Sequence, residues 1–189
     1  MSSSVGIYAS QISGHLTPPN SYASISTVTV GSGGASSITF SSIPSTYTHL
    51  QIRALTRTNA SGSTSWQSMR FNSSTSGYYD HYLGGNGSTA SAGAEALSDR
   101  INFGETAGNG ATSGMFGVGV IDILDYANIN KNKTVRFLDG YDLNGSGAVY
   151  LRSGLWQSTS AITQIDIAPQ NFGGTAFTQY SSFALYGVK

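Results

Sequence analysis

The sequence predicts an all-β protein, a β-sandwich or barrel built from about nine or ten short strands. Apolar residues alternate with polar residues at a period of two in most of the apolar segments. Turns rich in Ser, Gly and Asn separate these segments, and glycine alone contributes 24 residues. No segment longer than a single turn has the 3.6-residue period of an amphipathic helix. Short alternating strands joined by polar turns are typical of sandwiches and barrels.

Composition narrows the class of protein further. Of the 189 residues, 10% are charged. Ordinary domains contain about 25% charged residues. The net charge of zero gives no electrostatic attraction to nucleic acid or anionic membranes, so we expect neither partner. The 11 Tyr, 8 Phe and 2 Trp argue against disorder. The absence of cysteine excludes disulfides and thiolate metal sites.

Residues 1–20 are predicted to be a short extended arm that precedes one β-sandwich domain, residues 21–189. The arm ends in Pro18 and Pro19, and two prolines do not fit a central strand. The first ten residues lack the basic and apolar regions of a secretory signal. The apolar residues of the arm are unusual in a pure linker, and we expect them to contact a partner. They are Val5, Ile7, Ile12 and Leu16.

Two predicted strands in the first half of the chain change phase. In Ser21–Val30 the apolar residues move from one face to the other between Ile25 and Val28, which indicates a β-bulge. In His49–Thr58 the alternation breaks at Leu55, which predicts a bulge or a bend between sheets. The other strands predicted in this half are Ser37–Phe40, Ser65–Asn72 and Gly77–Leu83.

The second half begins with glycine-rich segments that we interpret as loops. Gly84–Ser98 is predicted to be the longest polar loop, with one helical turn at Ala94–Leu97, and Gly104–Gly114 is a second loop. Met115–Asp125, the most apolar run, is predicted to be a central strand that is buried on both faces near Val120–Leu124. The remaining strands are expected around Ile101 and Phe103 and at Lys133–Tyr141, Ala148–Leu155, Ile162–Ala168 and Ala176–Val188, with an Asn144-Gly145 hairpin turn.

A search for catalytic and metal-binding motifs gives no convincing site, and we expect neither an enzyme nor a cofactor. The chain contains no Gly-x-Ser-x-Gly nucleophile motif and no phosphate-binding glycine loop. Asp122 and Asp139 on paired strands are the best candidates for the two carboxylates of a glycosidase. The segment Asp142–Gly147 matches half of a calcium loop, but Ser153 stands where the bidentate glutamate belongs. We favour a plain hairpin turn.

Aromatic residues supply the remaining candidate contacts. Tyrosine and tryptophan stack on sugars, but they also fill the cores and the subunit interfaces of thin sandwiches. The second interpretation is favoured here. The candidates for ligand or subunit contact are Trp66, Tyr78, Tyr79 and Tyr82.

Several segments resemble a family of tailed-bacteriophage virion proteins, and the resemblance covers nearly all of the chain from Ser21 onward. It implies a jelly-roll-like antiparallel β-sandwich, found in head decoration (cement) proteins and in modules of tail fibres, without catalytic residues. The segments are Thr27–Arg53, Met69–Tyr79, Gly117–Arg136, Ser153–Ile165 and Phe177–Lys189.

Two functional hypotheses follow from this resemblance. The first is a decoration protein on the capsid exterior, expected as a homotrimer, with the major capsid protein or another virion protein as its partner. In this hypothesis the arm contacts the capsid or adjacent subunits. The second is a receptor- or glycan-binding module of a tail fibre or other tail appendage. A glycoside hydrolase that uses the aspartates is a third and weaker alternative. The first two place the protein in the virion.

Overall fold

The computed structural model describes residues 21–189, which form an antiparallel β-sandwich of two sheets. The predicted arm, with Val5, Ile7, Ile12 and Leu16, lies outside the described residues. The described part contains twelve strands and one short 3-10 helix, and every paired set of strands is antiparallel. The all-β class and the sandwich architecture are therefore confirmed.

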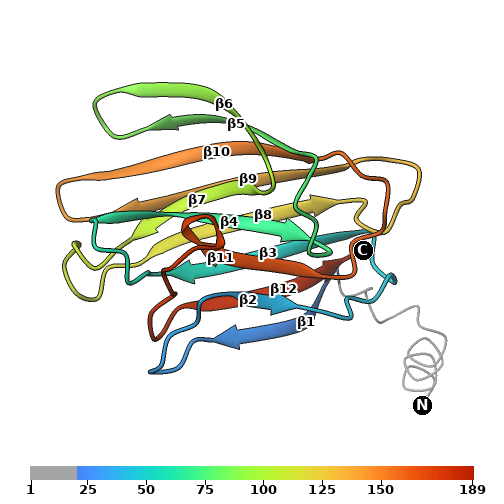
Figure 1. Ribbon diagram of the computed structural model, residues 1–189, viewed down its shortest axis with the longest axis horizontal. Coiled ribbons are helices and arrows are strands. Elements are labelled where there is room, and N and C mark those ends of the chain that lie inside the picture. Colours follow the sequence, from blue (N-terminus) through green and yellow to red (C-terminus); the bar gives the residue numbers. More distant parts are fainter. Residues whose placement is uncertain (1–20) are drawn as a thin grey trace, which may run out of the picture.

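The larger sheet has eight strands (Figure 1). From edge to edge they are β1 (Tyr22–Thr29), β12 (Ser182–Val188), β3 (His49–Thr56), β8 (Gly117–Leu124), β9 (Lys133–Asp142), β10 (Gly147–Trp156), β5 (Tyr78–Gly85) and β6 (Ala90–Ser98).

The smaller sheet has four strands and packs against one face of the larger sheet. Its order is β2 (Ile38–Phe40), β11 (Ile165–Pro169), β4 (Thr64–Phe71) and β7 (Ile101–Ala107), and the short helix η1 (Gln170–Phe172) follows β11. Only one face of the eight-stranded sheet is covered in this way within the described residues. We call the covered face the inner face and the opposite one the outer face.

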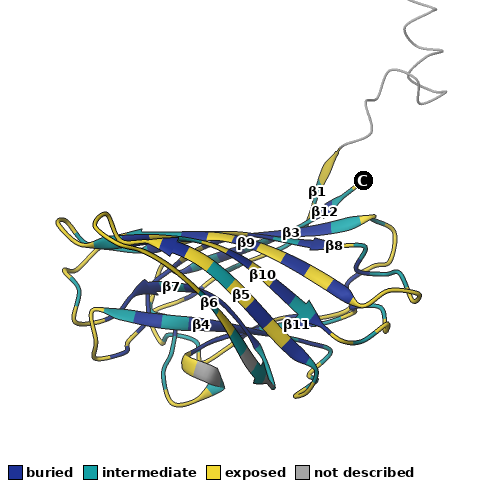
Figure 2. Ribbon diagram, turned by 90° about the horizontal axis from the view of Figure 1, so that it is seen from above, coloured by how far each residue is buried: buried dark blue, intermediate teal, exposed yellow. Residues whose placement is uncertain are grey.

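The core lies between the two sheets and consists of alternate residues from each strand. Phe137 of β9 and Ile121 of β8 are fully buried, as are Met69 of β4 and Ile165 of β11. Figure 2 shows buried and exposed residues alternating along the strands of the larger sheet. Burial of each such side chain stabilises the fold by roughly 1.5–3 kcal/mol.

Three local predictions are confirmed. The register of β1 against β12 shifts between Ser24 and Ser26, at the predicted bulge. Asn144 and Gly145 have positive φ angles of 58° and 113°. The hairpin turn between β9 and β10 requires such angles. Along β9 the residues Val135 and Phe137 point inward, as the alternation predicts.

Other local predictions are wrong. Leu55 does not break the alternation of β3, because it points outward in the same phase as Arg53. The second half of β8 is not buried on both faces, since Val120 and Leu124 are 37% and 41% exposed. These apolar residues lie on the face of the larger sheet that the smaller sheet does not cover.

The prediction of a polar loop at Gly84–Ser98 is also wrong. Strand β5 continues to Gly85, and the segment after the turn forms the edge strand β6, without a helical turn. The segment Gly104–Gly114 is a loop only after β7 ends at Ala107. Small residues weaken the strand signal, but in both places pairing with a neighbouring strand supplies backbone hydrogen bonds.

Within residues 21–189, no helix has the length and apolar character that crossing a membrane requires.

Candidate functional site

The outer face of the eight-stranded sheet carries an apolar patch of seven large side chains that are between 37% and 59% exposed. Soluble monomers rarely expose contiguous apolar areas of more than a few hundred Å², and larger areas mark interaction sites. The patch consists of Leu55, Leu83, Val118, Val120, Leu138, Val149 and Leu151.

Strand register places the patch in two adjacent rows that cross β3, β8, β9, β10 and β5. Cross-strand neighbours on one face of a sheet lie about 4.5–5.5 Å apart, so each row is continuous. The first row is Leu55, Val118, Gly140, Val149 and Gly85, and the second is Arg53, Val120, Leu138, Leu151 and Leu83.

A polar row borders the apolar patch on the same face. The side-chain amide of Gln51 donates a hydrogen bond of 2.8 Å to a carboxylate oxygen of Asp122. Across the next strand pair, Asp122 is the register neighbour of Arg136. This row therefore carries an acidic and a basic residue side by side. Its members are Gln51, Asp122, Arg136, Ser153 and His81.

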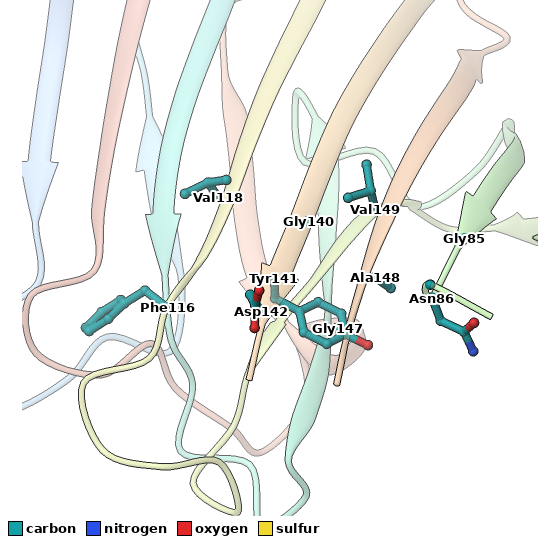
Figure 3. A pocket seen from close by; sticks show the side chains of 11 residues that line it. Gly85, Asn86, Phe116, Val118, Gly140, Tyr141, Asp142, Gly147, Ala148 and Val149 are labelled. Carbon is teal, nitrogen blue, oxygen red and sulfur yellow. The ribbon is translucent and has the colours of Figure 1, made fainter. Parts of the chain in front are cut away.

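A hollow of about 540 Å³ opens along the first row, four of whose members line it. Its floor contains Gly140, which has no side chain, and Figure 3 shows Val118 and Val149 on either side of it. Phe116 and Asn86 also line the hollow. The glycine thus leaves a recess between two protruding valines, a shape that accepts an apolar side chain.

The inner face holds a charged cluster around Arg152 of β10. The side chain of Arg152 is 0% exposed, and its Nε donates a hydrogen bond of 3.2 Å to Asp139 of β9. The guanidinium carbon lies 4.4 Å from the ring centre of Tyr150, 4.9 Å from that of Trp66 and 5.3 Å from that of Tyr82. Three aromatic faces and one carboxylate therefore stabilise this buried cation.

Two aspartates near Arg152 have raised pKa values. Burial raises the pKa of Asp139 to about 6, against the opposing effect of Arg152. Burial also raises the pKa of Asp80 to about 6, although Asp80 accepts a hydrogen bond from the backbone amide of Asn102. Neighbouring Glu95 acts in the same direction as burial on the pKa of Asp80. The two groups consequently titrate closer to neutral pH than ordinary carboxyl groups.

Glycines make room for the aromatic rings of this cluster. A Cβ atom at Gly84 would collide with the ring of Tyr150, and one at Gly93 would lie 2.7 Å from the ring of Tyr82. Such contacts are shorter than real Cβ atoms tolerate. These glycines therefore determine where the rings lie over the sheet, and the rings in turn enclose Arg152.

The four aromatic candidates from the sequence lie in three different places. Trp66 and Tyr82 are partly buried beside Arg152. Tyr78 is 0% exposed in the core, where it stacks on Trp156 at 6.1 Å, so its side chain does not reach the surface. Tyr79 is 42% exposed on the outer face. They do not form one binding site.

The two candidate catalytic acids lie on opposite faces of the larger sheet. Asp122 is on the outer face and Asp139 is on the inner face. Strands β8 and β9 therefore do not present both carboxylates to one substrate, and the arrangement that the glycosidase alternative requires of these two acids is not found. Within residues 21–189, no group of three or more His, Cys, Asp or Glu is arranged to hold a metal ion.

Sequence reasoning missed the apolar patch and the Arg152 cluster. The sequence does place Val149 and Leu151 on one face of β10 and Tyr150 and Arg152 on the other. Which face is buried depends on what packs against it, and here the face with the arginine is the inner one.

No family model, curated protein or solved structure matches this chain.

Proposed function

We propose that this chain is a phage virion structural protein, and specifically a capsid decoration protein that binds the head exterior. The observation that carries the proposal is the continuous apolar patch on the outer face of the eight-stranded sheet. A patch of this kind fits a protein that acts by binding other proteins. The sequence resemblance supplies the virion as the setting, with further copies and the major capsid protein or another virion protein as partners.

The electrostatics support the same role. Only 10% of the residues are charged, and the net charge is zero. Such a chain packs beside identical copies without mutual repulsion. An apolar patch that binds a neighbour avoids the cost of removing charged groups from water. Many weak contacts on a symmetric lattice add up through multivalency.

The proposal includes a jelly-roll connectivity. A jelly roll is a double-sheet structure of eight strands, in which a long two-stranded ribbon wraps around itself. Four pairings support this connectivity, since β1 pairs with β12, β2 with β11, β3 with β8 and β4 with β7. The hairpins β5–β6 and β9–β10 are then insertions that widen one sheet from four strands to eight. These insertions carry Leu83, Leu138, Val149 and Leu151 of the apolar patch.

Cryo-electron microscopy of virus particles tests the proposal. We expect density for the sandwich at repeated positions of the head lattice, and a copy number that matches those positions by quantitative mass spectrometry. Density in a few copies at the tail, with none on the head, would contradict the decoration role.

The second candidate is a receptor- or glycan-binding module of a tail appendage. Exposed Tyr79 on the outer face and the hollow with Asn86 and Phe116 favour it, because aromatic faces and amides are groups that bind sugars. A glycan array with the wild type, Tyr79→Ala and Trp66→Ala separates the candidates. Sugar binding that Tyr79→Ala abolishes supports the tail module, and no binding at millimolar sugar counts against it.

A further inference from the structure

The strand register gives the outer face a self-complementary pattern about the line between β8 and β9. Each outward residue of β8 has a register neighbour on β9: Val118 is beside Gly140, Val120 beside Leu138 and Asp122 beside Arg136. A two-fold axis along this line, parallel to the strands, places β8 of one copy over β9 of the other. Each outward residue of β8 then lies over the β9 residue of the other copy that has the number of its own register neighbour. Val118 of one copy, for example, lies over Gly140 of the other.

We infer that the partner of the apolar patch is a second copy of this chain, bound face to face about this two-fold axis. The inference rests on the proposed function of the patch as an assembly surface and names its partner. The copies pack their outer faces as two sheets of a sandwich do, about 10 Å apart.

Shape complementarity supports the second copy. In this arrangement Val118, which is 58% exposed, enters the hollow over Gly140 of the other copy. The same contact occurs twice because the axis relates the two copies. Leu138 of each copy covers Val120 of the other. The two leucines and two valines, the four most central apolar residues, are therefore all removed from solvent.

Charge complementarity points to the same pairing. The polar row would lie opposite itself, with Asp122 of each copy over Arg136 of the other. The two opposite-charge contacts lie along one side of the apolar rows and fix the relative position of the sheets. A surface of a single sign in this row would repel its own copy, and this row contains both signs.

The area of the face is sufficient for a specific dimer. The outer face of the five strands that carry the patch is about 24 Å across and about eight residues, or about 27 Å, long along the strands. The planar area is therefore about 650 Å² per copy and about 1,300 Å² in total, which lies within the range of specific interfaces. A two-fold dimer differs from the homotrimer that the sequence resemblance implies, and a mass measurement distinguishes them.

Sedimentation equilibrium of the purified full-length chain provides the first test. We expect a concentration-dependent dimer, and we expect Leu138→Lys to weaken dimerisation by about tenfold or more, because it places a charge in the centre of the contact. Ile129→Lys makes the same change at a residue that is 68% exposed in a loop outside the patch. It is the matched control and leaves the dimer intact.

Three outcomes of this experiment would overturn the inference. They are a wild type that stays monomeric, a trimeric mass, and an oligomer that Leu138→Lys and Ile129→Lys leave equally intact. Thermal unfolding of each variant checks the fold, since Leu138 is 55% exposed and its replacement removes no core contact.

A charge exchange tests the symmetry axis itself. Asp122→Arg places like charges opposite each other in its own dimer, and so does Arg136→Asp. We expect each variant alone to dimerise weakly, whereas an equimolar mixture forms a heterodimer in which both contacts between positions 122 and 136 again pair an arginine with an aspartate. In that heterodimer the doubly basic row of one copy lies over the doubly acidic row of the other. Native mass spectrometry resolves the three species. Equal dimerisation of the two separate variants and the mixture would contradict the proposed axis.

These tests separate the inference from the proposed function. Dimerisation is measured on the purified chain, and the decoration role is measured by copy number and position in particles. A dimer that is absent from the head lattice removes only the decoration role. A monomer on the head lattice removes only the face-to-face dimer.

Discussion

The guanidinium Nε of Arg152 lies 3.2 Å from Asp139 Oδ1, and the two side chains are only 0% and 2% exposed. Removing one partner of a buried ion pair lowers the stability of a protein strongly, because the remaining charge has no water to solvate it. The pair also joins neighbouring strands β9 and β10 beneath the patch. It therefore affects the stability of the sheet that carries the proposed interface.

The first prediction concerns this ion pair. Arg152→Met leaves the Asp139 carboxyl without its cation, and Asp139→Leu leaves Arg152 without its anion. We expect each single change to lower the free energy of unfolding by about 3–5 kcal/mol in urea denaturation. The double variant should lose less than the sum of the two, and strict additivity would show that the pair contributes no coupling.

The second prediction concerns pH. Burial raises the folded-state pKa values of Asp80 and Asp139 to about 6, above the ordinary value of 3.8. Between about pH 4 and pH 6 the folded state then binds more protons than the unfolded state, so the contribution of these groups to stability falls as pH rises. Charged groups close to them on the inner side are Arg152, Glu95 and Glu105.

We expect Asp80→Asn to reduce the decrease in melting temperature between about pH 4.5 and about pH 7, because one of the two titrating groups is removed. Asp142→Asn removes one carboxyl group in an exposed position at the end of β9 and is the matched control for the loss of a negative charge. A profile of Asp80→Asn that superimposes on the wild type would mean that Asp80 keeps an ordinary pKa.

The third prediction compares two adjacent glycines of β5. A Cβ atom at Gly84 would collide with the Tyr150 ring, whereas one at Gly85 would have its nearest neighbour at 3.9 Å. We expect Gly84→Ala to destabilise the fold by about 1–3 kcal/mol through overpacking and Gly85→Ala to have little effect. Thermal unfolding measures both. Equal effects of the two substitutions would show that the ring moves aside freely.

The fourth prediction compares two adjacent tyrosines. Tyr78 is fully buried, and its hydroxyl accepts a hydrogen bond of 2.9 Å from the Phe71 backbone amide, whereas Tyr79 is 42% exposed. We expect Tyr78→Ala to cost about 3–5 kcal/mol, as for other large aromatic residues in cores. Tyr79→Ala should change the free energy of unfolding by less than about 1 kcal/mol. Similar losses in chemical denaturation would place both rings in the core.

Sequence alone determined the strand periodicity of this protein and several of its turns. Val135 and Phe137 point inward as their alternation predicts, and Asn144-Gly145 forms the expected hairpin turn. These features are local, because side chains of a strand alternate between faces and only a few residue types adopt a positive φ angle readily.

Tertiary structure alone decided which strand faces are covered. Val118, Val120 and Leu124 look like core residues in the sequence, yet they lie on the outer face because the four-stranded sheet covers only the opposite one. Arg152 looks like a surface residue, yet three aromatic rings and Asp139 enclose it. The alternation of residues along a strand shows that its two faces differ. Which face is buried depends on strands from distant parts of the chain that pack against it. The exposure of the apolar patch and the burial of the charged cluster are both decided by this packing of distant strands.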